Sequence, residues 1–331
     1  MPYSPEQSMS RRKMLAGLGA AGVVAGSNAG AALARAPMQN VQAPAFYRFK
    51  VGGFEATVIS DGPLGLGAPS DGVFSGVSKV DMTKVLTDNF LPTDNVELEQ
   101  NTLLINTGNQ LVLFDTGDGG SKMFGTKSGR QLANLRAAGI EPKEIDAVVL
   151  THAHGDHCWG LMSAAAGTPN FPNAQIYLAQ ADYDFWTDES KAKGDMMKAM
   201  IEGTRRQLLP NRDRMIFIKD GQEFLPGIQA MAAPGHTVGH TVYVITSEGK
   251  TLLNSGDIAH HAVISTQTPR ATFAFDTDGA QGVASRLKVF DMLASQRMPF
   301  VSYHFPWPGL GYLAKEGDGY RYFASPMQTV L

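Results

Sequence analysis

Length, composition and charge exclude several classes of protein. The chain has 331 residues, of which 43% are hydrophobic and 18% are charged, as in an ordinary globular protein rather than a disordered or collagen-like one. Its 28 Lys and Arg residues against 31 Asp and Glu residues give a net charge of −3, too weak a field to attract nucleic acid or an anionic membrane. A single cysteine, Cys158, excludes an internal disulfide framework and a cysteine-rich metal cage.

The first 36 residues have the features of an export signal. Arg11 and Arg12 directly precede an apolar stretch rich in Gly and Ala, and Ala34-Arg35-Ala36 has the small-x-small pattern of a cleavage site. The segment resembles twin-arginine export signals, and its many glycines make it too weakly apolar to favour a membrane anchor. We therefore expect a twin-arginine-type signal peptide at residues 1–36 and a mature domain at residues 37–331, periplasmic or secreted.

The mature part mixes hairpins with strand–helix units, which is typical of α+β or layered α/β folds. Gly52-Gly53 and Thr107-Gly108-Asn109 each separate two strand-like runs, as expected of hairpin turns. No change of composition divides this part, so we expect one domain. Apolar patterns predict strands at 46–51, 54–59, 102–106, 111–114, 145–150, 174–178, 216–219, 228–232, 241–245 and 251–254, and helices at 128–138, 180–189 and 279–293.

Histidines are absent from the first 151 residues, and all 8 lie at or after position 152. The segment Thr151-His152-Ala153-His154-Gly155-Asp156-His157 directly follows the strand predicted at 145–150. Residues two apart on an extended strand end face the same way, so His152 and His154 are expected to converge on one ion. Asp156 and His157 follow the turn at Gly155 and are expected to face a second ion. Imidazole and carboxylate groups together favour zinc or a similar divalent metal.

Other candidate ligands also come directly after predicted strands, where several strand ends can meet at one edge of a sheet. The alternative, a set of hydrogen-bonded polar residues in the core, does not account for this order and spacing. Asp115 has a second interpretation, because a residue before Thr-Gly can simply cap a turn. The candidates are Asp115, His236, Asp257 and His304.

Together these residues resemble the HxHxDH signature and the later ligands of the metallo-β-lactamase superfamily. A narrower similarity to the group of methyl parathion hydrolases and lactonases is carried by 235–241 (GHTVGHT) and 304–309 (HFPWPG). The resemblance implies an α/β fold, the four-layer αββα sandwich. It also implies two Zn²⁺ ions, the first bound by His152, His154 and His236, the second by Asp156, His157 and His304, with Asp257 bridging them. Asp115 and His240 would support these ligands from outside.

The resemblance further implies a hydrolase in which a bridging hydroxide attacks the substrate, with Asp257, Asp156 and His304 as the catalytic groups. Lactones or activated aryl esters are the expected substrates, and organophosphate triesters are the alternative. A glyoxalase II-type thioesterase or a true β-lactamase fits less well. A homodimer is expected by analogy, and no nucleic-acid or membrane partner is expected. The residues expected to line the substrate pocket are Phe124, Trp186, Met197, His261, Phe305 and Trp307.

Overall fold

The computed structural model describes residue 38 and residues 44–331. Residues 44–331 belong to one compact unit. The signal peptide predicted at 1–36, and the start of the mature domain at residue 37, lie outside the described residues and stay predictions. Within the described part of the chain, no helix combines the length and the apolar character that crossing a membrane requires.

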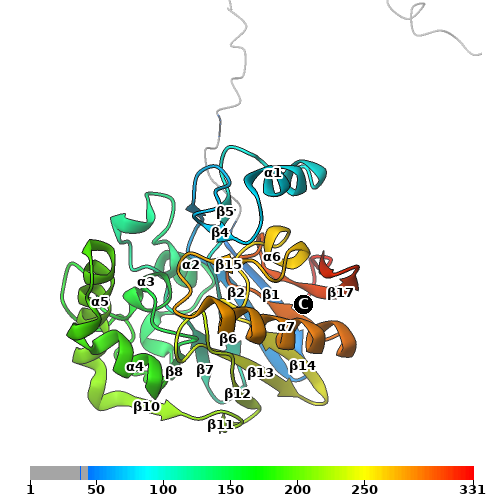
Figure 1. Ribbon diagram of the computed structural model, residues 1–331. Helices are drawn as coiled ribbons and strands as arrows, with labels where there is room; N and C mark the ends of the chain where they lie inside the picture. Colours follow the sequence, from blue (N-terminus) through cyan, green and yellow to red (C-terminus); the bar gives the residue numbers. More distant parts are fainter. Residues whose placement is uncertain (1–37, 39–43) are drawn as a thin grey trace, which may run out of the picture. The chain divides into compact units, whose positions relative to one another are not determined.

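The first half of this unit builds a seven-stranded sheet in the order β1-β2-β6-β7-β8-β9-β10 (Figure 1). The hairpin between β1 and β2 turns at Gly52, whose φ of +59° is one that glycine adopts without strain. Strands β7 to β10 run parallel, so their carboxyl ends share one edge. The strands are β1 (Phe46–Val51), β2 (Phe54–Ser60), β6 (Asn101–Asn106), β7 (Leu111–Phe114), β8 (Ala147–Val149), β9 (Gln175–Ala179) and β10 (Met215–Ile218).

A second seven-stranded sheet has the order β11-β12-β13-β14-β16-β17-β18. Strands β12 and β14 are both antiparallel to β13, and β16 is parallel to β14. As a result β12, β14 and β16 all end at the same edge. The strands are β11 (Glu223–Leu225), β12 (Ile228–Ala232), β13 (Thr241–Ser247), β14 (Lys250–Asn254), β16 (Phe300–Val301), β17 (Leu310–Glu316) and β18 (Gly319–Ala324). Two small sheets pair β3 (Leu64–Gly65) with β5 (Glu97–Leu98), and β4 (Phe74–Ser75) with β15 (Thr272–Phe273).

Helices follow many of the strands. The α-helices are α1 (Lys79–Asp88), α2 (Gln131–Ala137), α3 (Gly155–Cys158), α4 (Gln180–Thr187), α5 (Asp195–Leu208), α6 (Ile264–Gln267) and α7 (Gly279–Gln296). Short 3₁₀ turns are η1 (Lys122–Phe124), η2 (Pro142–Glu144), η3 (Trp159–Leu161), η4 (Glu189–Lys191) and η5 (Leu209–Arg214). The longest helix, α7, begins at Asp278, whose side chain accepts a hydrogen bond from the backbone N–H of Gln281 and so caps the helix.

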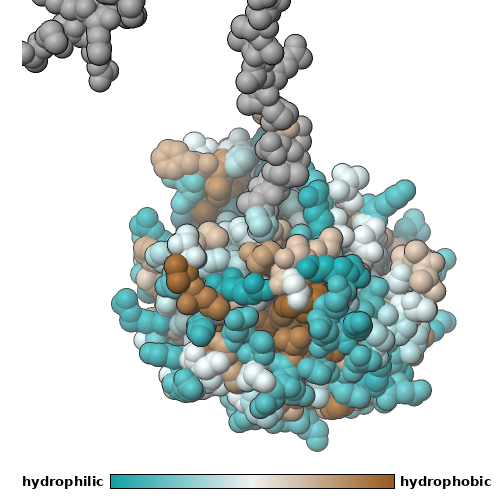
Figure 2. Space-filling view, turned by 180° about the vertical axis from the view of Figure 1, so that it is seen from behind, coloured by the Kyte–Doolittle hydropathy of each residue, from teal (hydrophilic) through white to brown (hydrophobic). Residues whose placement is uncertain are grey.

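Three apolar layers explain why the two sheets and the helices stack. Between the sheets, inward-facing side chains form one core, in which the rings of Phe114 and Tyr243 lie 5.3 Å apart. On the outer faces, α2, α4 and α5 cover the first sheet and α7 covers the second, through Leu135, Trp186, Ile201, Val289 and Phe290. Figure 2 shows that the face opposite to that of Figure 1 is mostly hydrophilic, with hydrophobic side chains in separate patches. The predicted four-layer αββα sandwich is confirmed.

The predicted elements differ from the observed ones in two ways. Some observed elements are shorter than predicted, and others were not predicted. The strand expected at 145–150 is shorter, β8 (Ala147–Val149), and the helix expected at 128–138 begins only at Gln131. Helix α5 and the β17–β18 hairpin were not predicted at all. Neither was the excursion of residues 61–100, which contains α1 and three two-residue strands. Its side chains form a small core of their own with Ile264 and Phe273.

Candidate metal centre

The two sheets bring their polar strand ends to one edge of the sandwich. The loop after β8 carries His152 and His154 and leads into α3, whose single turn carries Asp156 and His157. The loops after β12, β14 and β16 carry the remaining candidates, His236, Asp257 and His304. All seven residues, here called the ligand set, are at most 8% exposed. The structure therefore gathers residues that are up to about 150 positions apart in the sequence.

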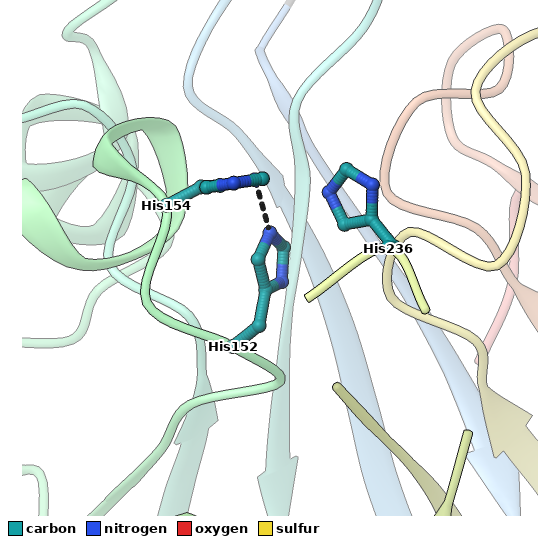
Figure 3. Close-up of side chains that lie close together, drawn as sticks. All are labelled: His152, His154 and His236. Atoms are coloured by element: carbon teal, nitrogen blue, oxygen red, sulfur yellow. Dashed lines mark hydrogen bonds between the residues drawn. The ribbon is translucent and has the colours of Figure 1, made fainter. Parts of the chain in front are cut away.

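Three groups within the ligand set have donor atoms close enough together to hold an ion, and one of them, His152 with His157 and Asp257, shares residues with the other two. His152, His154 and His236 form one group and Asp156, His157 and His304 form another, with the donor atoms of each group within 4.8 Å of one another. In the first group, His152 Nε2 lies 3.0 Å from His154 Nδ1, and the ring of His236 faces both (Figure 3). These are the two groups that the resemblance implied for the first and the second metal.

Asp257 lies between the two groups. Its Oδ2 atom is 3.3 Å from His236 Nε2 and 3.1 Å from His304 Nε2. Its Oδ1 atom is 3.3 Å from His157 Nε2. The carboxylate thus touches a member of each group, which is the position required of a bridging ligand.

Buried nitrogen and oxygen atoms without hydrogen-bond partners show that the ligand set fits a pair of divalent cations. His157 Nε2, His236 Nε2 and Asp257 Oδ1 are buried and have no hydrogen-bond partner among the described residues. Buried polar atoms are normally paired, so such orphans at one place call for a bound group. Imidazole nitrogens with carboxylate oxygens are donors that zinc and similar divalent cations bind.

In three histidines of the ligand set, Nδ1 hydrogen-bonds to a residue outside the set, so Nε2 is the nitrogen left to bind a metal. His157 Nδ1 donates to Asp115 Oδ2 at 3.0 Å, and His236 Nδ1 donates to Asp276 Oδ1 at 3.0 Å. His304 Nδ1 donates to the carbonyl of Glu99 at 2.7 Å. Because a carboxylate or a carbonyl can only accept, each Nδ1 carries a proton, and Nε2 is the nitrogen that can bind a metal once it has no proton.

Asp115 hydrogen-bonds to His157 and to the start of the loop after β8. Its two oxygens accept hydrogen bonds from the backbone N–H and the hydroxyl of Thr151, at 2.8 Å and 2.9 Å, besides that from His157. Its backbone has a φ of +62°, which places the side chain under the loop after β8. Burial raises the pKa of Asp115, and the hydrogen bonds to His157 and Thr151 oppose this effect.

His240 supports Asp257 from behind. Its Nδ1 donates to the carbonyl of Ala233 at 3.0 Å, and its Nε2 accepts the backbone N–H of Asp257 at 2.9 Å. Burial lowers the pKa of His240 to about 3, so the ring is neutral and able to accept. Gly256 makes this contact possible, because a Cβ atom there would lie 2.7 Å from His240 Nε2.

Burial and charge set the protonation of the ligand set itself. Burial lowers the pKa of His152 and of His154, so both are neutral near pH 7. Burial opposes the charged form of His157, but the carboxylates of Asp257 and Asp156 outweigh it and raise the pKa of that histidine. Burial likewise favours neutral Asp257, yet the charges of His157 and His304 keep its pKa well below the usual value. Asp257 is therefore ionised.

Asp182 is a supporting residue that the sequence analysis missed. It lies in the first turn of α4 and is fully buried. Its carboxylate accepts the backbone N–H groups of Ala153, at 2.8 Å, and of Gly239, at 2.6 Å, and the hydroxyl of Thr237 at 3.0 Å. Burial raises the pKa of Asp182 to about 6. It ties together the loops that carry His152, His154 and His236. No local signal marks it, because the loops it joins are distant in sequence.

A cavity of about 580 Å³ opens onto the ligand set, whose members His154, Asp156, His236, Asp257 and His304 form its floor. Its walls come from the excursion at 61–100, from the segment around η1, from the start of α5 and from β15. The main apolar wall residues are Leu64, Leu66, Leu98, Met123, Phe124, Met196, Met200, Phe273 and Phe275, and the charged ones are Glu97, Lys122 and Lys127. The wall residue that the sequence predicted is Phe124.

Two of the predicted pocket residues lie just behind the cavity. Trp186 is 2% exposed and packs edge-on against the ring of His154, at 4.8 Å between centroids, so it supports a ligand rather than facing the cavity. Met197 packs against the outer core of the first sheet, while its helical neighbours Met196 and Met200 reach the cavity. The prediction of a methionine here was one position out of phase with the helix.

Three other predicted pocket residues are structural and do not line the cavity. His261 Nδ1 accepts the backbone N–H groups of Val263 and Ile264 and so shapes its own loop. Phe305 is fully buried under α7, in the core of the second sheet. Trp307 packs against the core between the two sheets. In each case a residue that the resemblance suggested for the pocket belongs to the apolar core or hydrogen-bonds to its own loop.

Comparisons with known proteins agree with this geometry. Over 205 residues the chain is 28% identical to an N-acyl homoserine lactonase of Bacillus sp., covering 58% of this chain and 73% of that relative. The structure of AidC, a dizinc quorum-quenching lactonase in complex with a product, is similar with a TM-score of 0.80 at 28% identity, covering 86% of this chain and 98% of the other. The hydrolase AbOPH of the beta lactamase superfamily is similar with a TM-score of 0.80 at 26% identity, covering 87% and 100%. Residues 96–295 match the metallo-beta-lactamase superfamily as a family, and the chain belongs to that superfamily.

Proposed function

We propose that this chain is a hydrolase that holds two Zn²⁺ ions and opens lactones or cleaves activated aryl esters. The observation that carries the proposal is the position of Asp257 between two histidine-rich groups at the floor of an apolar cavity. A hydrolytic reaction needs water activation and an apolar binding site side by side, and this arrangement offers both.

The ligand set would hold the two ions, because the hydrogen bonds at Nδ1 of His157, His236 and His304 already orient these rings. His152, His154 and His236 would bind one ion, and Asp156, His157 and His304 the other, with Asp257 contributing to both. Such a pair of cations lowers the pKa of water enough to supply hydroxide at neutral pH, and it polarises the carbonyl oxygen of an ester.

The chain's own residues would position the reacting groups. The hydrogen bond from His157 to Asp115 keeps the imidazole Nε2 directed at the centre, and His240 holds the backbone of Asp257 in place. The apolar wall would bind the acyl or aryl part of the substrate and exclude bulk water from the floor. The ester group itself would lie over Asp257 and His304, which line the same cavity.

The lactone preference is supported by the relatives, since both an N-acyl homoserine lactonase and a dizinc lactonase are similar to this chain at 28% identity. It is tested by comparing kcat/KM for an N-acyl homoserine lactone, dihydrocoumarin, paraoxon and a penicillin, with the metal content measured in each preparation. We expect one of the two lactones to be favoured over paraoxon and the penicillin by about 100-fold or more.

Two results would overturn the proposal in different ways. Preferred hydrolysis of paraoxon would replace the lactonase by an organophosphate triester hydrolase that uses the same centre. Hydrolysis of the penicillin alone would make the chain a β-lactamase.

We also propose that residues 1–36 form a twin-arginine-type export signal, so that the hydrolase acts in the periplasm or outside the cell. The support is the pair Arg11 and Arg12 before a weakly apolar stretch. Cell fractionation of the full chain and of an Arg11→Lys, Arg12→Lys variant tests this. We expect the full chain in the periplasm or the medium and the variant in the cytoplasm, and equal distribution of both would contradict the proposal.

A further inference from the structure

One further imidazole beside Asp257 belongs to neither of the two groups assigned above. His260 lies three residues after Asp257, in the segment that follows β14, and its Nε2 is 3.4 Å from Asp257 Oδ2. Its ring centroid is 4.6 Å from that of His236 and 5.6 Å from that of His304. The ring therefore borders the centre on the side where the two groups meet.

The burial of His260 leaves both of its ring nitrogens without a function in the fold. The residue is 1% exposed, and within residues 44–331 neither Nδ1 nor Nε2 has a hydrogen-bond partner. The next residue, His261, is also buried, yet its Nδ1 accepts two backbone N–H groups. Since unpaired buried polar atoms are disfavoured, the nitrogens of His260 need a partner that the protein atoms do not supply.

The fold holds this ring in one orientation. The face of His260 stacks on Phe273, with centroids 3.7 Å apart and an interplanar angle of 17°. Its backbone N–H donates to Ser265 Oγ at 3.3 Å. The same loop is clamped further back, where Arg286 Nε donates to the carbonyl of Ile258 at 2.8 Å. A side chain fixed from several directions, with its nitrogen toward a carboxylate, is preorganised for binding.

We propose that His260 is a metal ligand of this chain in addition to the seven of the ligand set. Together with His236 and Asp257 it forms a further group whose donor atoms lie within 4.8 Å of one another. His260 is not among the residues that line the cavity, and its Nε2 lies 3.4 Å from Asp257 Oδ2, on the side of the ligand set. The inference rests on the proposed two-cation site, which it extends by one donor.

The test compares the His260→Phe variant of the whole chain with the unaltered chain. Phenylalanine keeps an aromatic ring stacked on Phe273 but removes both nitrogens. Zn²⁺ affinity is measured by competition with a chromogenic chelator, and the absorption spectrum is recorded after loading with Co²⁺. We expect one of the two bound equivalents to be held about 10- to 100-fold more weakly, with a changed Co²⁺ spectrum. The control is Phe273→Leu, which removes the stacking partner but keeps the imidazole, and it should retain both equivalents.

A second measurement does not depend on a variant that folds. Anomalous diffraction from crystals of the unaltered chain loaded with Co²⁺ should place an ion within about 2.0–2.3 Å of His260 Nε2. An ion more than about 3 Å from that atom, or a His260→Phe variant that binds both equivalents as tightly as the unaltered chain, would overturn the inference and leave the proposed function intact. An unaltered chain that binds no cations would overturn both.

Discussion

The ligand set and the cavity wall are neighbours, yet their side chains are held in very different ways. In the ligand set, His157, His236 and His304 each hydrogen-bond through Nδ1 to a residue outside the set, and all members are buried. In the wall, Met196 and Met123 are 65% and 51% exposed and come from short turns and helix starts. The difference teaches that the candidate metal centre is built into the sandwich, whereas the cavity wall is formed by segments added around its edge.

Among the substitutions that test this difference, we expect the largest effect from Asp257, the residue proposed to bridge the two groups. In Asp257→Asn the side chain keeps its size but loses the charge that faces His157, His236 and His304. We expect a fall in kcat/KM of about 1000-fold or more, together with loss of bound metal. Steady-state kinetics and elemental analysis of the same preparation check this. A variant with metal and near-normal kcat/KM would show that Asp257 does not join the two groups.

A change at Asp182 tests whether the ligand loops depend on the core beneath them. Each oxygen of Asp182 accepts a backbone N–H, from Ala153 and from Gly239. In Asp182→Asn the amide NH₂ must face one of these N–H groups whichever way the amide is turned. We expect a loss of unfolding free energy of about 1–3 kcal/mol, measured by chemical denaturation.

The matched control is Asp184→Asn, an exposed position on the same helix. It should change the unfolding free energy by less than about 0.5 kcal/mol. Equal stability of the two variants would mean that Asp182 does not hold the loops together.

A change in the wall should affect substrate choice with little effect on stability. Met196 lines the cavity, whereas Met197 packs away from it. For Met196→Ala we expect the KM for a long-chain N-acyl homoserine lactone to rise by about three- to tenfold, with kcat and the KM for a short-chain lactone changing less. Met197→Ala is the control and should leave the KM for both lactones unaltered. A larger effect at Met197 than at Met196 would reverse our assignment of the wall.

The same division explains what could be predicted from the sequence. The residues proposed to bind metal were identifiable because His152, His154, Asp156 and His157 lie within one short motif, and the later candidates each follow a strand. Asp182 and Asp276 were not, because they contact the ligand loops across 29 to 57 positions of sequence. Hydrogen bonds of that kind leave no local pattern.

The wall was the least predictable part. The excursion at 61–100 has strands of only two residues, too short for a periodic pattern to reveal. The unpredicted helix α5 left the phase of its methionines undetermined, which is why Met197 was expected where Met196 lies. Phe305, an aromatic residue next to a candidate ligand, packs in the core of the second sheet, because burial of a large apolar side chain is favourable.

The most direct test of the account is a metal titration of the metal-free chain. The protein is stripped with a chelator, Zn²⁺ is added back stepwise, and both bound metal and lactone hydrolysis are measured at each step. Our account predicts a chain that is inactive without metal and that regains activity until two equivalents are bound, with no further rise beyond. Full activity in the metal-free chain, or saturation of binding with no return of hydrolysis, would contradict it.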